Sequence, residues 1–423
     1  MAIFFYLYRS QFCLYKVKCL AITIKGKVKF GRRVEMEEKI LGYEQSNLEA
    51  WNGIYTAKEI HQQPDVWLKV LHQISTHKEV IQSFLDQVLE HEDLEIILTG
   101  AGTSAFAGEV VEPYLHQLTK KSVRAIATTD IVANPFGYLS PEKPTLLISY
   151  ARSGNSPESV ATVQLAKQLV RHLYQIVITC NKEGKLAQFA GEDEGSLLLL
   201  MPDETNDMSF AMTSSCTSMI LTNIAIFNLK TLHNLQTDLF NVRENLLDLF
   251  NNTDLFNEIL TYDYDRLIFL GSGPLKGIAR EMALKTLELT AGIVNANYDT
   301  PLGFRHGPKS VINDKTLIVV LKNNQTYPKY YDEDLIRELL SERKENKVLV
   351  LCNDHVADDS VYFGRAIKNN VILGMQYLAF GQILALKKSL SLGITPDNPC
   401  PTGEVNRVVK GVTIYQFKEE KGC

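Results

Sequence analysis

Short apolar runs alternate with segments of helical periodicity along most of the chain. The runs at 94–99 and 145–150 are rich in leucine and isoleucine and have the length of buried parallel strands. Helical spacing follows over residues such as 157–170 and 276–290. This alternation predicts an α/β fold in which helices cover both faces of a parallel sheet.

The strand pattern occurs twice at a nearly constant offset of 171 or 172 residues. The matching segments are 97–102 with 268–273, 145–148 with 316–319, and 176–181 with 348–353. Three runs that recur in the same order and with the same spacing indicate a duplicated unit. The sequence therefore predicts two tandem α/β domains, each on the order of 150 residues.

The pattern and the composition divide the chain into five expected segments. Residues 1–35 carry a short apolar run followed by lysines and arginines, which fits neither a signal peptide nor a membrane span. We expect them to be a non-native or disordered extension, with the mature protein starting at Met36. The other expected segments are a helical amino-terminal segment at 36–80, a first domain at 81–240, a second domain at 241–395 and a carboxyl-terminal tail at 396–423.

Two loops of glycine and hydroxyl residues each follow a predicted strand and precede a predicted helix. A helix N-terminus presents free N–H groups, glycine allows close backbone approach, and hydroxyls add hydrogen bonds, so such a loop is suited to a phosphate. Two of them in one half of the chain favour a phosphosugar site beyond the carboxyl ends of the strands. The candidate binding residues are Gly102, Thr103, Ser104, Arg152, Ser153, Asn155 and Ser156.

Two other interpretations of these loops remain open. Serine and threonine are common N-caps in any α/β protein, so either loop alone could be purely structural. Gly100, Gly102 and Ala105 also fit a loose dinucleotide fingerprint, which needs an acidic residue about 20 positions later. Lysines and Arg124 stand there instead, so the dinucleotide match is weak.

The second half lacks the hydroxyls of the first. Positions equivalent to Thr103, Ser153 and Ser156 are Pro274, Asn324 and Tyr327. We therefore expect one phosphate pocket per chain, lined mainly by the first half.

Composition narrows the class of partner. A net charge of −5 argues against nucleic acid, which usually requires a basic face. The seven cysteines are scattered and odd in number, which is typical of a cytosolic chain without a disulfide framework. No motif predicts a metal, and no segment predicts a membrane partner.

A third constellation could carry acid–base chemistry. Lys285 and Glu288 are three residues apart and share a helix face, and His306 follows in Arg305-His306-Gly307-Pro308. A carboxylate, an imidazole and an ammonium are the groups that open a sugar ring and move a proton between C1 and C2. Taken alone, the Lys285–Glu288 pair could be a surface salt bridge and His306 a structural histidine.

Together, Gly100-Ala101-Gly102-Thr103-Ser104, Arg152 to Ser159 and Phe304 to Pro308 resemble the sugar isomerase (SIS) domain superfamily. More narrowly, the chain resembles the tagatose-6-phosphate ketose/aldose isomerase family, also described as galactosamine-6-phosphate deaminase. It is similar as well to the isomerase half of glucosamine-6-phosphate synthase. The resemblance implies two SIS domains, each with a five-stranded parallel sheet in a three-layer α/β/α arrangement, and a homodimer or homotetramer with the site near a subunit interface.

The resemblance also implies the roles of individual residues. Glu288 would move the proton between C1 and C2 with the assistance of Lys285, and His306 would open the ring, from the same or a neighbouring subunit. The segment from Asn398 to Thr413 resembles the synthase tail, which assigns an active-site lysine to Lys410. Thr103, Ser104, Ser153 and Ser156 would hold the phosphate.

Three departures from the synthase bear on the reaction. The spacing from Glu288 to His306 is two residues longer, and Ala151 replaces a phosphate-contacting serine. The sequence contains no glutaminase domain, which favours release of ammonia over its incorporation. The expected reaction is cofactor-independent conversion of galactosamine 6-phosphate to tagatose 6-phosphate and ammonia. Isomerisation without nitrogen release and a non-catalytic sugar-phosphate sensor remain the alternatives.

Overall fold

A computed structural model describes residues 39–342, 345–354, 360–407, 409 and 411–417 of the chain. These residues belong to one compact unit. The expected extension at 1–35 and the expected start at Met36 lie outside the described residues.

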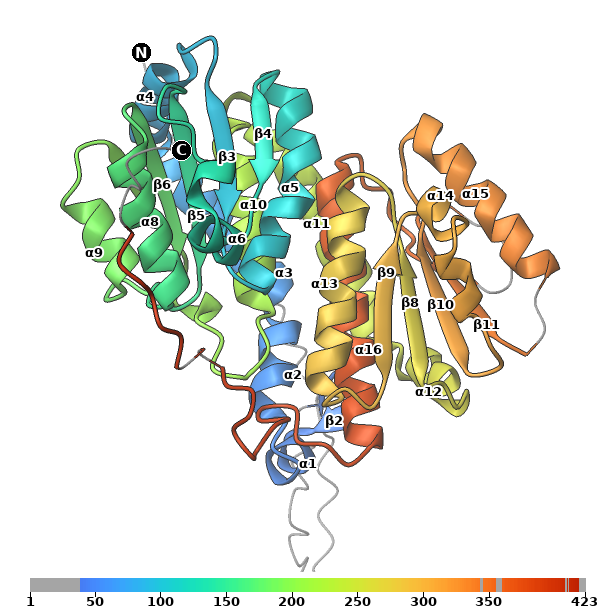
Figure 1. Cartoon of the computed structure of the whole chain (residues 1–423). Helices are drawn as coiled ribbons and strands as arrows, with labels where there is room; N and C mark the ends of the chain where they lie inside the picture. Colours follow the sequence, from blue (N-terminus) through green and yellow to red (C-terminus); the bar gives the residue numbers. More distant parts are fainter. Residues whose placement is uncertain (1–38, 343–344, 355–359, 408, 410, 418–423) are drawn as a thin grey trace, which may run out of the picture. The chain divides into compact units, whose positions relative to one another are not determined.

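Two parallel sheets of five strands each organise the described part of the chain (Figure 1). The first has the strand order β4-β3-β5-β6-β7. Its strands are β3 (Glu95–Thr99), β4 (Ser122–Ala125), β5 (Thr145–Ala151), β6 (Leu173–Thr179) and β7 (Ser196–Leu200). Every residue of β5 is buried because both faces of the sheet are covered, which explains why the strand has a continuous apolar sequence.

The second sheet repeats this arrangement with the order β9-β8-β10-β11-β12. Its strands are β8 (Arg266–Leu270), β9 (Asn295–Asp299), β10 (Thr316–Leu321), β11 (Lys347–Cys352) and β12 (Ser360–Tyr362). Thus β8 corresponds to β3, β9 to β4 and β10 to β5. The prediction of two tandem α/β domains with five-stranded parallel sheets is confirmed.

Three helices, α5 (Thr103–Thr119), α13 (Pro274–Leu289) and α16 (Asn370–Ser391), lie between the sheets (Figure 1). α5 follows β3 and α13 follows β8, so these two helices are equivalent in the repeat. They pack so closely that a Cβ atom on Gly277 would lie 2.7 Å from the backbone nitrogen of Val110. An ion pair between Arg280 and Glu109 also joins them. This crossing brings side chains of the second repeat to the first sheet.

The predicted helical amino-terminal segment is confirmed, and helix continues to Leu89. A hairpin of β1 (Lys39–Ile40) and β2 (Tyr43–Glu44) precedes these helices. Strands of two residues are too short to show a periodicity in the sequence, so they could not be predicted. The remaining α-helices of the described residues are α1 (Gln45–Ala50), α2 (Ile54–His61), α3 (Gln63–Thr76), α4 (Lys78–Leu89), α6 (Thr128–Ala133), α7 (Pro135–Tyr138), α8 (Pro157–Leu169), α9 (Lys185–Gly191), α10 (Ser214–Ile226), α11 (Leu232–Asn251), α12 (Thr253–Thr261), α14 (Pro301–Phe304) and α15 (Thr326–Ser341). Short 3₁₀ turns occur at η1 (Asp203–Thr205), η2 (Leu229–Thr231) and η3 (Pro308–Val311).

The amino-terminal helices contact both repeats, since α3 packs on α10 and α11 and α2 packs on α16. Trp67 of α3 is fully buried, and its indole N–H donates to the Thr217 hydroxyl of α10 over 2.9 Å. The expected boundaries at residues 80 and 240 lie inside α4 and α11. Within the described ranges, no helix is both long and apolar enough to span a bilayer.

Candidate active site

The two glycine and hydroxyl loops leave the same edge of the first sheet. β3 and β5 are neighbouring parallel strands with Leu98 opposite Ile148, so the loops at 100–102 and 152–156 start side by side. Gly102 has a φ of 56°, a conformation that favours glycine, and α5 begins at the next residue. The second loop leads directly into α8. The structure therefore brings the two predicted loops together at two helix N-termini.

The predicted binding hydroxyls differ in their contacts. Thr103 is buried, and its Oγ1 donates to Glu281 Oε1 over 3.1 Å and accepts from Lys285 Nζ over 3.0 Å. Ser153 Oγ accepts only a long hydrogen bond of 3.3 Å from the backbone of Asn155 among the contacts described. Thr103 is thus tied to charged groups, which leaves the 152–156 loop better placed to receive an anion.

The other members of these loops are held by near neighbours. Ser104 is buried with its Oγ 3.9 Å from Met212 Sδ, and Ser156 Oγ donates to Ser159 Oγ over 2.6 Å. Asn155 Oδ1 accepts from the backbone N–H of Lys185 over 3.0 Å. These contacts order the loops, and the roles of their residues in substrate binding stay predictions.

A buried charged cluster on α13 faces the start of α5. Lys285 is 0% exposed, its Nζ lies 3.4 Å from Glu281 Oε1, and it pairs with Glu288 Oε2. Glu281 is 1% exposed, whereas Glu288 keeps 22% of its side-chain surface accessible. The pair Lys285–Glu288 is therefore no surface salt bridge. The accessible carboxylate of Glu288 is supported by a fully buried cation.

Burial changes the protonation of this cluster. It raises the pKa of Glu281 to about 7, even though Lys285 acts in the opposite direction. Burial alone would lower the pKa of Lys285, but the charges of Glu281 and Glu288 outweigh it and hold that pKa above its ordinary value. Lys285 is therefore charged at neutral pH, while Glu281 is poised to exchange a proton.

Sequence reasoning assigned no role to Glu281. Its signal was the spacing of four residues before Lys285, which places both side chains on one helix face. Within the described part of the chain, Glu281 Oε2 is buried without a hydrogen-bond partner. Glu281 therefore belongs to the same buried charged cluster as Lys285 and Glu288.

Arg152 links the 152–156 loop to the carboxyl-terminal tail. The side chain is buried, with Nη2 donating to the Arg407 carbonyl over 2.9 Å and Nη1 to the Phe210 carbonyl over 3.3 Å. Burial, followed by the charge of Arg407, lowers its pKa. These contacts are to the protein backbone, and direct binding of substrate by Arg152 stays a prediction.

The tail passes from the end of α16 to the side of α8 (Figure 1). Arg407 Nε donates to the Ser209 carbonyl over 3.2 Å, and the ring of Phe417 lies 5.3 Å from that of Phe136. The tail thus contacts the first repeat at two points. Lys410, the predicted active-site lysine, lies outside the described residues.

Two buried carboxylates brace the loop beneath the tail. Glu59 of α2 accepts from the backbone N–H and the hydroxyl of Ser209, and Asp207 accepts from the N–H of Thr213 over 2.8 Å and of Ser215 over 2.9 Å. Burial and the charge of Asp207 raise the pKa of Glu59 to about 7. The sequence analysis missed both, because their partners lie far away or in an irregular loop.

His306 lies on an exposed turn after α14, remote from Glu288 of the same chain. Glu288 sits at the end of α13, before β9 begins, whereas His306 follows the end of β9. Five strand residues carry the chain about 16 Å between these two edges of the sheet. The structure does not bring His306 to the charged cluster within one chain.

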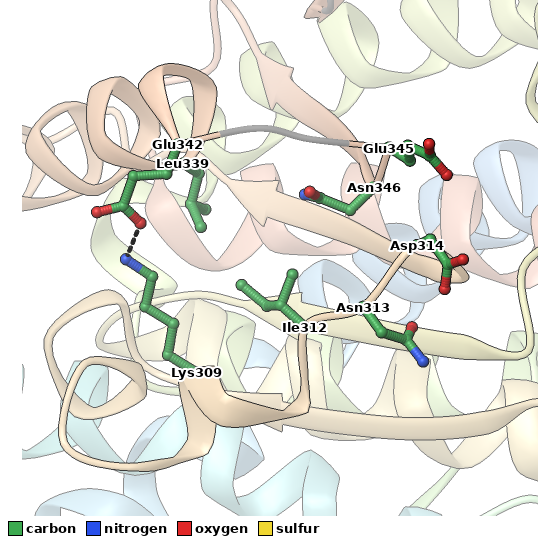
Figure 2. A pocket seen from close by; sticks show the side chains of 8 residues that line it. All are labelled: Lys309, Ile312, Asn313, Asp314, Leu339, Glu342, Glu345 and Asn346. Atoms are coloured by element: carbon green, nitrogen blue, oxygen red, sulfur yellow. Dashed lines mark hydrogen bonds and ion pairs between the residues drawn. The ribbon is translucent and has the colours of Figure 1, made fainter.

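Ion pairs hold the His306 turn to α15. Arg305 Nε donates to Glu338 Oε2 over 2.8 Å, and Lys309 pairs with Glu338 and Glu342. Figure 2 shows Lys309 pointing toward Glu342 at the edge of a hollow of ≈ 400 Å³. No predicted site residue lines this hollow. Among the described residues, no group of three or more His, Cys, Asp or Glu side chains is arranged to hold a metal.

Comparison with known proteins agrees with this geometry. The SIS domain model matches residues 89–229. D-galactosamine-6-phosphate deaminase AgaS of Shewanella sp. (strain ANA-3) is 44% identical over 389 residues, which cover 90% of this chain and 97% of that relative. This chain belongs to the AgaS family. The resemblance stated from the sequence is thereby confirmed.

Solved structures similar to this AgaS family member share its fold over nearly their whole length. Tagatose-6-phosphate ketose/aldose isomerase from Escherichia coli is 40% identical with a TM-score of 0.79, covering 86% of this chain and 97% of that one. A structure from Clostridium novyi NT is 44% identical with a TM-score of 0.88. The match covers 90% of this chain and 100% of that chain.

Proposed function

We propose that this chain converts galactosamine 6-phosphate to tagatose 6-phosphate and ammonia. The observation that carries the proposal is the buried Lys285, which is held between Glu281 and Glu288 and bonded to Thr103 at the N-terminus of α5. An accessible carboxylate next to a buried cation can accept a carbon-bound proton, and the loop N–H groups can hold a phosphate. The AgaS relatives carry the deaminase name at 43–44% identity.

The proposed reaction begins with the open-chain aldose. Glu288 removes the C2 proton, and C1 is then protonated, which gives an imine at C2. Water adds to this imine and ammonia leaves, which produces the ketose. The C2 proton is acidic because it lies next to a carbonyl, so the proton transfer needs no electron carrier. Lys285 stabilises the negative charge that develops on the oxygen at C1.

Ring opening is assigned to His306 of a second copy of the chain. Within one chain, the length of β9 separates His306 from Glu288. Exposed apolar side chains lie near both groups in the sequence, namely Ile293 at 58% and Leu302 at 45% exposure. A homodimer would cover these side chains and complete the site, and a homotetramer could contain two such pairs.

Lys410 is proposed to act as an active-site lysine, the role that the resemblance to the synthase tail implies. The described residues on either side of it, Arg407 and Phe417, contact the first repeat. Thr103, Ser104, Ser153 and Ser156 are proposed to surround the phosphate, with Thr103 also linking that end of the site to Lys285.

The decisive assay is ammonia release from galactosamine 6-phosphate and, separately, glucosamine 6-phosphate. We expect release from the galacto sugar that the Glu288→Gln variant abolishes and the Glu79→Gln variant retains, since Glu79 is an exposed residue of α4. If neither sugar released ammonia, the deaminase proposal would be overturned. Ketose formation without ammonia would replace it with simple aldose/ketose isomerisation.

Subunit mixing tests the shared site. Glu288→Gln and His306→Ala variants are each expected to be inactive alone. Hybrid dimers would contain one intact site, so mixing followed by subunit exchange should restore up to about a quarter of the wild-type activity per chain when half of the dimers are hybrids. No recovery despite demonstrated exchange would contradict the contribution of His306 from a second copy.

A further inference from the structure

A second cavity lies at the carboxyl edge of the second sheet. Its volume is ≈ 880 Å³, and the starts of three helices line it. Gly273 and Pro274 lie where α13 begins, Gln325 comes directly before α15, and Asn370 is the first residue of α16. Three helix N-termini therefore converge on it, and each contributes positive potential.

This cavity is the counterpart of the candidate active site in the second repeat. Gly273 has a φ of 59°, as Gly102 has 56° in the first repeat. The helix that closes the cavity is α5, through Tyr114 and Gln117. The repeat offset of 171 residues places Tyr114 where the first site has Lys285, and Gln117 where it has Glu288. The groups proposed for proton transfer are thus replaced by neutral polar side chains.

The charged residues of the cavity suit an anion. Its lining includes two lysines, Lys120 and Lys368, and one acid, Asp238. The Asp238 carboxylate already accepts the backbone N–H groups of Lys368 over 3.1 Å and of Asn369 over 2.7 Å. The two lysines outnumber this one acid, so the lining carries a net positive charge. Lysine side chains can donate charge-assisted hydrogen bonds to a phosphate, the task proposed for the loop hydroxyls of the first repeat.

An unpartnered side chain in the lining also points to a ligand. Asn370 is 4% exposed, and both its Oδ1 and its Nδ2 are buried without a hydrogen-bond partner among the described residues. A buried amide without partners costs about 1–3 kcal/mol, so native structures rarely retain one. An amide can donate to and accept from a sugar hydroxyl.

We propose that this cavity is a second, non-catalytic binding site for a phosphorylated sugar. The phosphate would lie between the α13 N-terminus and the two lysines, and Asn370 and Gln117 would hydrogen-bond the hydroxyls. The site binds its ligand without turning it over, because neither a carboxylate base nor a buried cation stands at the positions equivalent to Glu288 and Lys285.

Galactitol 6-phosphate is a suitable probe because it has no carbonyl and cannot react. Its binding to the full chain is measured by titration calorimetry for wild type, Lys368→Glu and Thr237→Trp. The first variant reverses a lining charge, and the second places an indole in the cavity from an exposed position on α11. Lys58→Glu, an exposed lysine on α2, is the matched control, and circular dichroism establishes that all variants fold.

We expect a binding component that is lost or weakened at least tenfold in both cavity variants and retained in Lys58→Glu. Ammonia release by Lys368→Glu without added probe should stay within about twofold of wild type. Isotherms of both cavity variants that superpose on wild type, or absence of binding by wild type, would overturn the proposal. Because binding is read without turnover, this result does not depend on whether the chain proves to be a deaminase.

Discussion

The two repeats share a scaffold and differ in the chemistry that their partner helix presents. Each has a glycine turn with φ near 60°, a helix that starts there, and a second helix lying across. In the first, that second helix is α13 with Lys285 and Glu288, and in the second it is α5 with Tyr114 and Gln117. On the two proposals above, the shared scaffold provides an anion cavity in each repeat, and the opposing helix determines whether that cavity can catalyse.

The largest expected effect removes the base from the first repeat. Glu288→Gln keeps the shape of the side chain but cannot accept a proton, so kcat for ammonia release should fall by about 10²- to 10⁴-fold with little change in KM. Steady-state kinetics with galactosamine 6-phosphate measure this. A fall of less than tenfold would show that another group removes the C2 proton.

The buried cation is expected to matter for stability as well as rate. Lys285→Met leaves Glu281 buried without its charge partner, which should lower the free energy of unfolding by about 3–5 kcal/mol. Urea denaturation measures the loss. The double variant Glu281→Gln/Lys285→Met should regain part of the stability and none of the activity. Full recovery of activity would show that the cluster is structural only.

Stability should also depend on the Glu59 carboxyl. Its pKa is raised to about 7 in the folded state, so the unfolded chain loses this proton first as pH rises. The free energy of unfolding is therefore greatest below about pH 4.5 for this group and falls by up to about 3 kcal/mol toward pH 7. Urea denaturation of wild type, Glu59→Gln and the control Asp130→Asn between about pH 4.5 and pH 7 measures whether the free energy of unfolding falls as pH rises. Glu59→Gln should reduce the dependence, because buried Glu281 keeps its own share of it, and Asp130→Asn should leave it unchanged.

Arg407, which holds the carboxyl-terminal tail against the first repeat, is expected to have a smaller effect on catalysis. Arg407→Ala removes the contacts to the Ser209 and Asp207 carbonyls, so the tail should be held less firmly over the site. We expect kcat/KM to fall about tenfold, which corresponds to ~1.4 kcal/mol, with little loss of stability. Kinetics and limited proteolysis of the tail measure this. Unchanged kinetics would separate the tail from catalysis.

The smallest expected effect is at the counterpart of Lys285. Tyr114→Phe removes only a hydroxyl that accepts from Asn228 Nδ2 over 2.8 Å, which should cost about 0.5–1.5 kcal/mol of stability. Urea denaturation beside Lys285→Met gives the comparison directly. Equal losses from both would contradict the view that buried charge distinguishes the two repeats.

Much of the fold could be predicted because its information is local. The apolar runs at 94–99 and 145–150 became β3 and β5 within one residue, and the helical spacing from residue 157 became α8. The repeat offset predicted a duplicated unit, and the two sheets do have equivalent strand orders. Such features depend on periodicity within a few residues, which the sequence displays directly.

The parts of the site that escaped prediction depend on long-range packing. Whether Lys285 is buried depends on the approach of α5, more than 160 residues earlier in the chain. The pairing of Glu59 with Ser209 joins an amino-terminal helix to an irregular loop. The sequence analysis did not expect the cavity of the second repeat, because it looked for loop hydroxyls, which this repeat lacks. The lysines of the cavity, Lys120 and Lys368, lie far apart in the sequence and outside those loops.

The crossing of α5 and α13 bears on how such a protein could arise. Thr103 comes from one repeat and Lys285 from the other, so a single repeat could assemble this cluster only by pairing two separate chains. Gene duplication with fusion would convert that encounter into an intramolecular one, with an effective concentration in the millimolar range or higher. Once both partners were encoded together, each helix was free to specialise. One copy could then keep its acid and base while the other lost them.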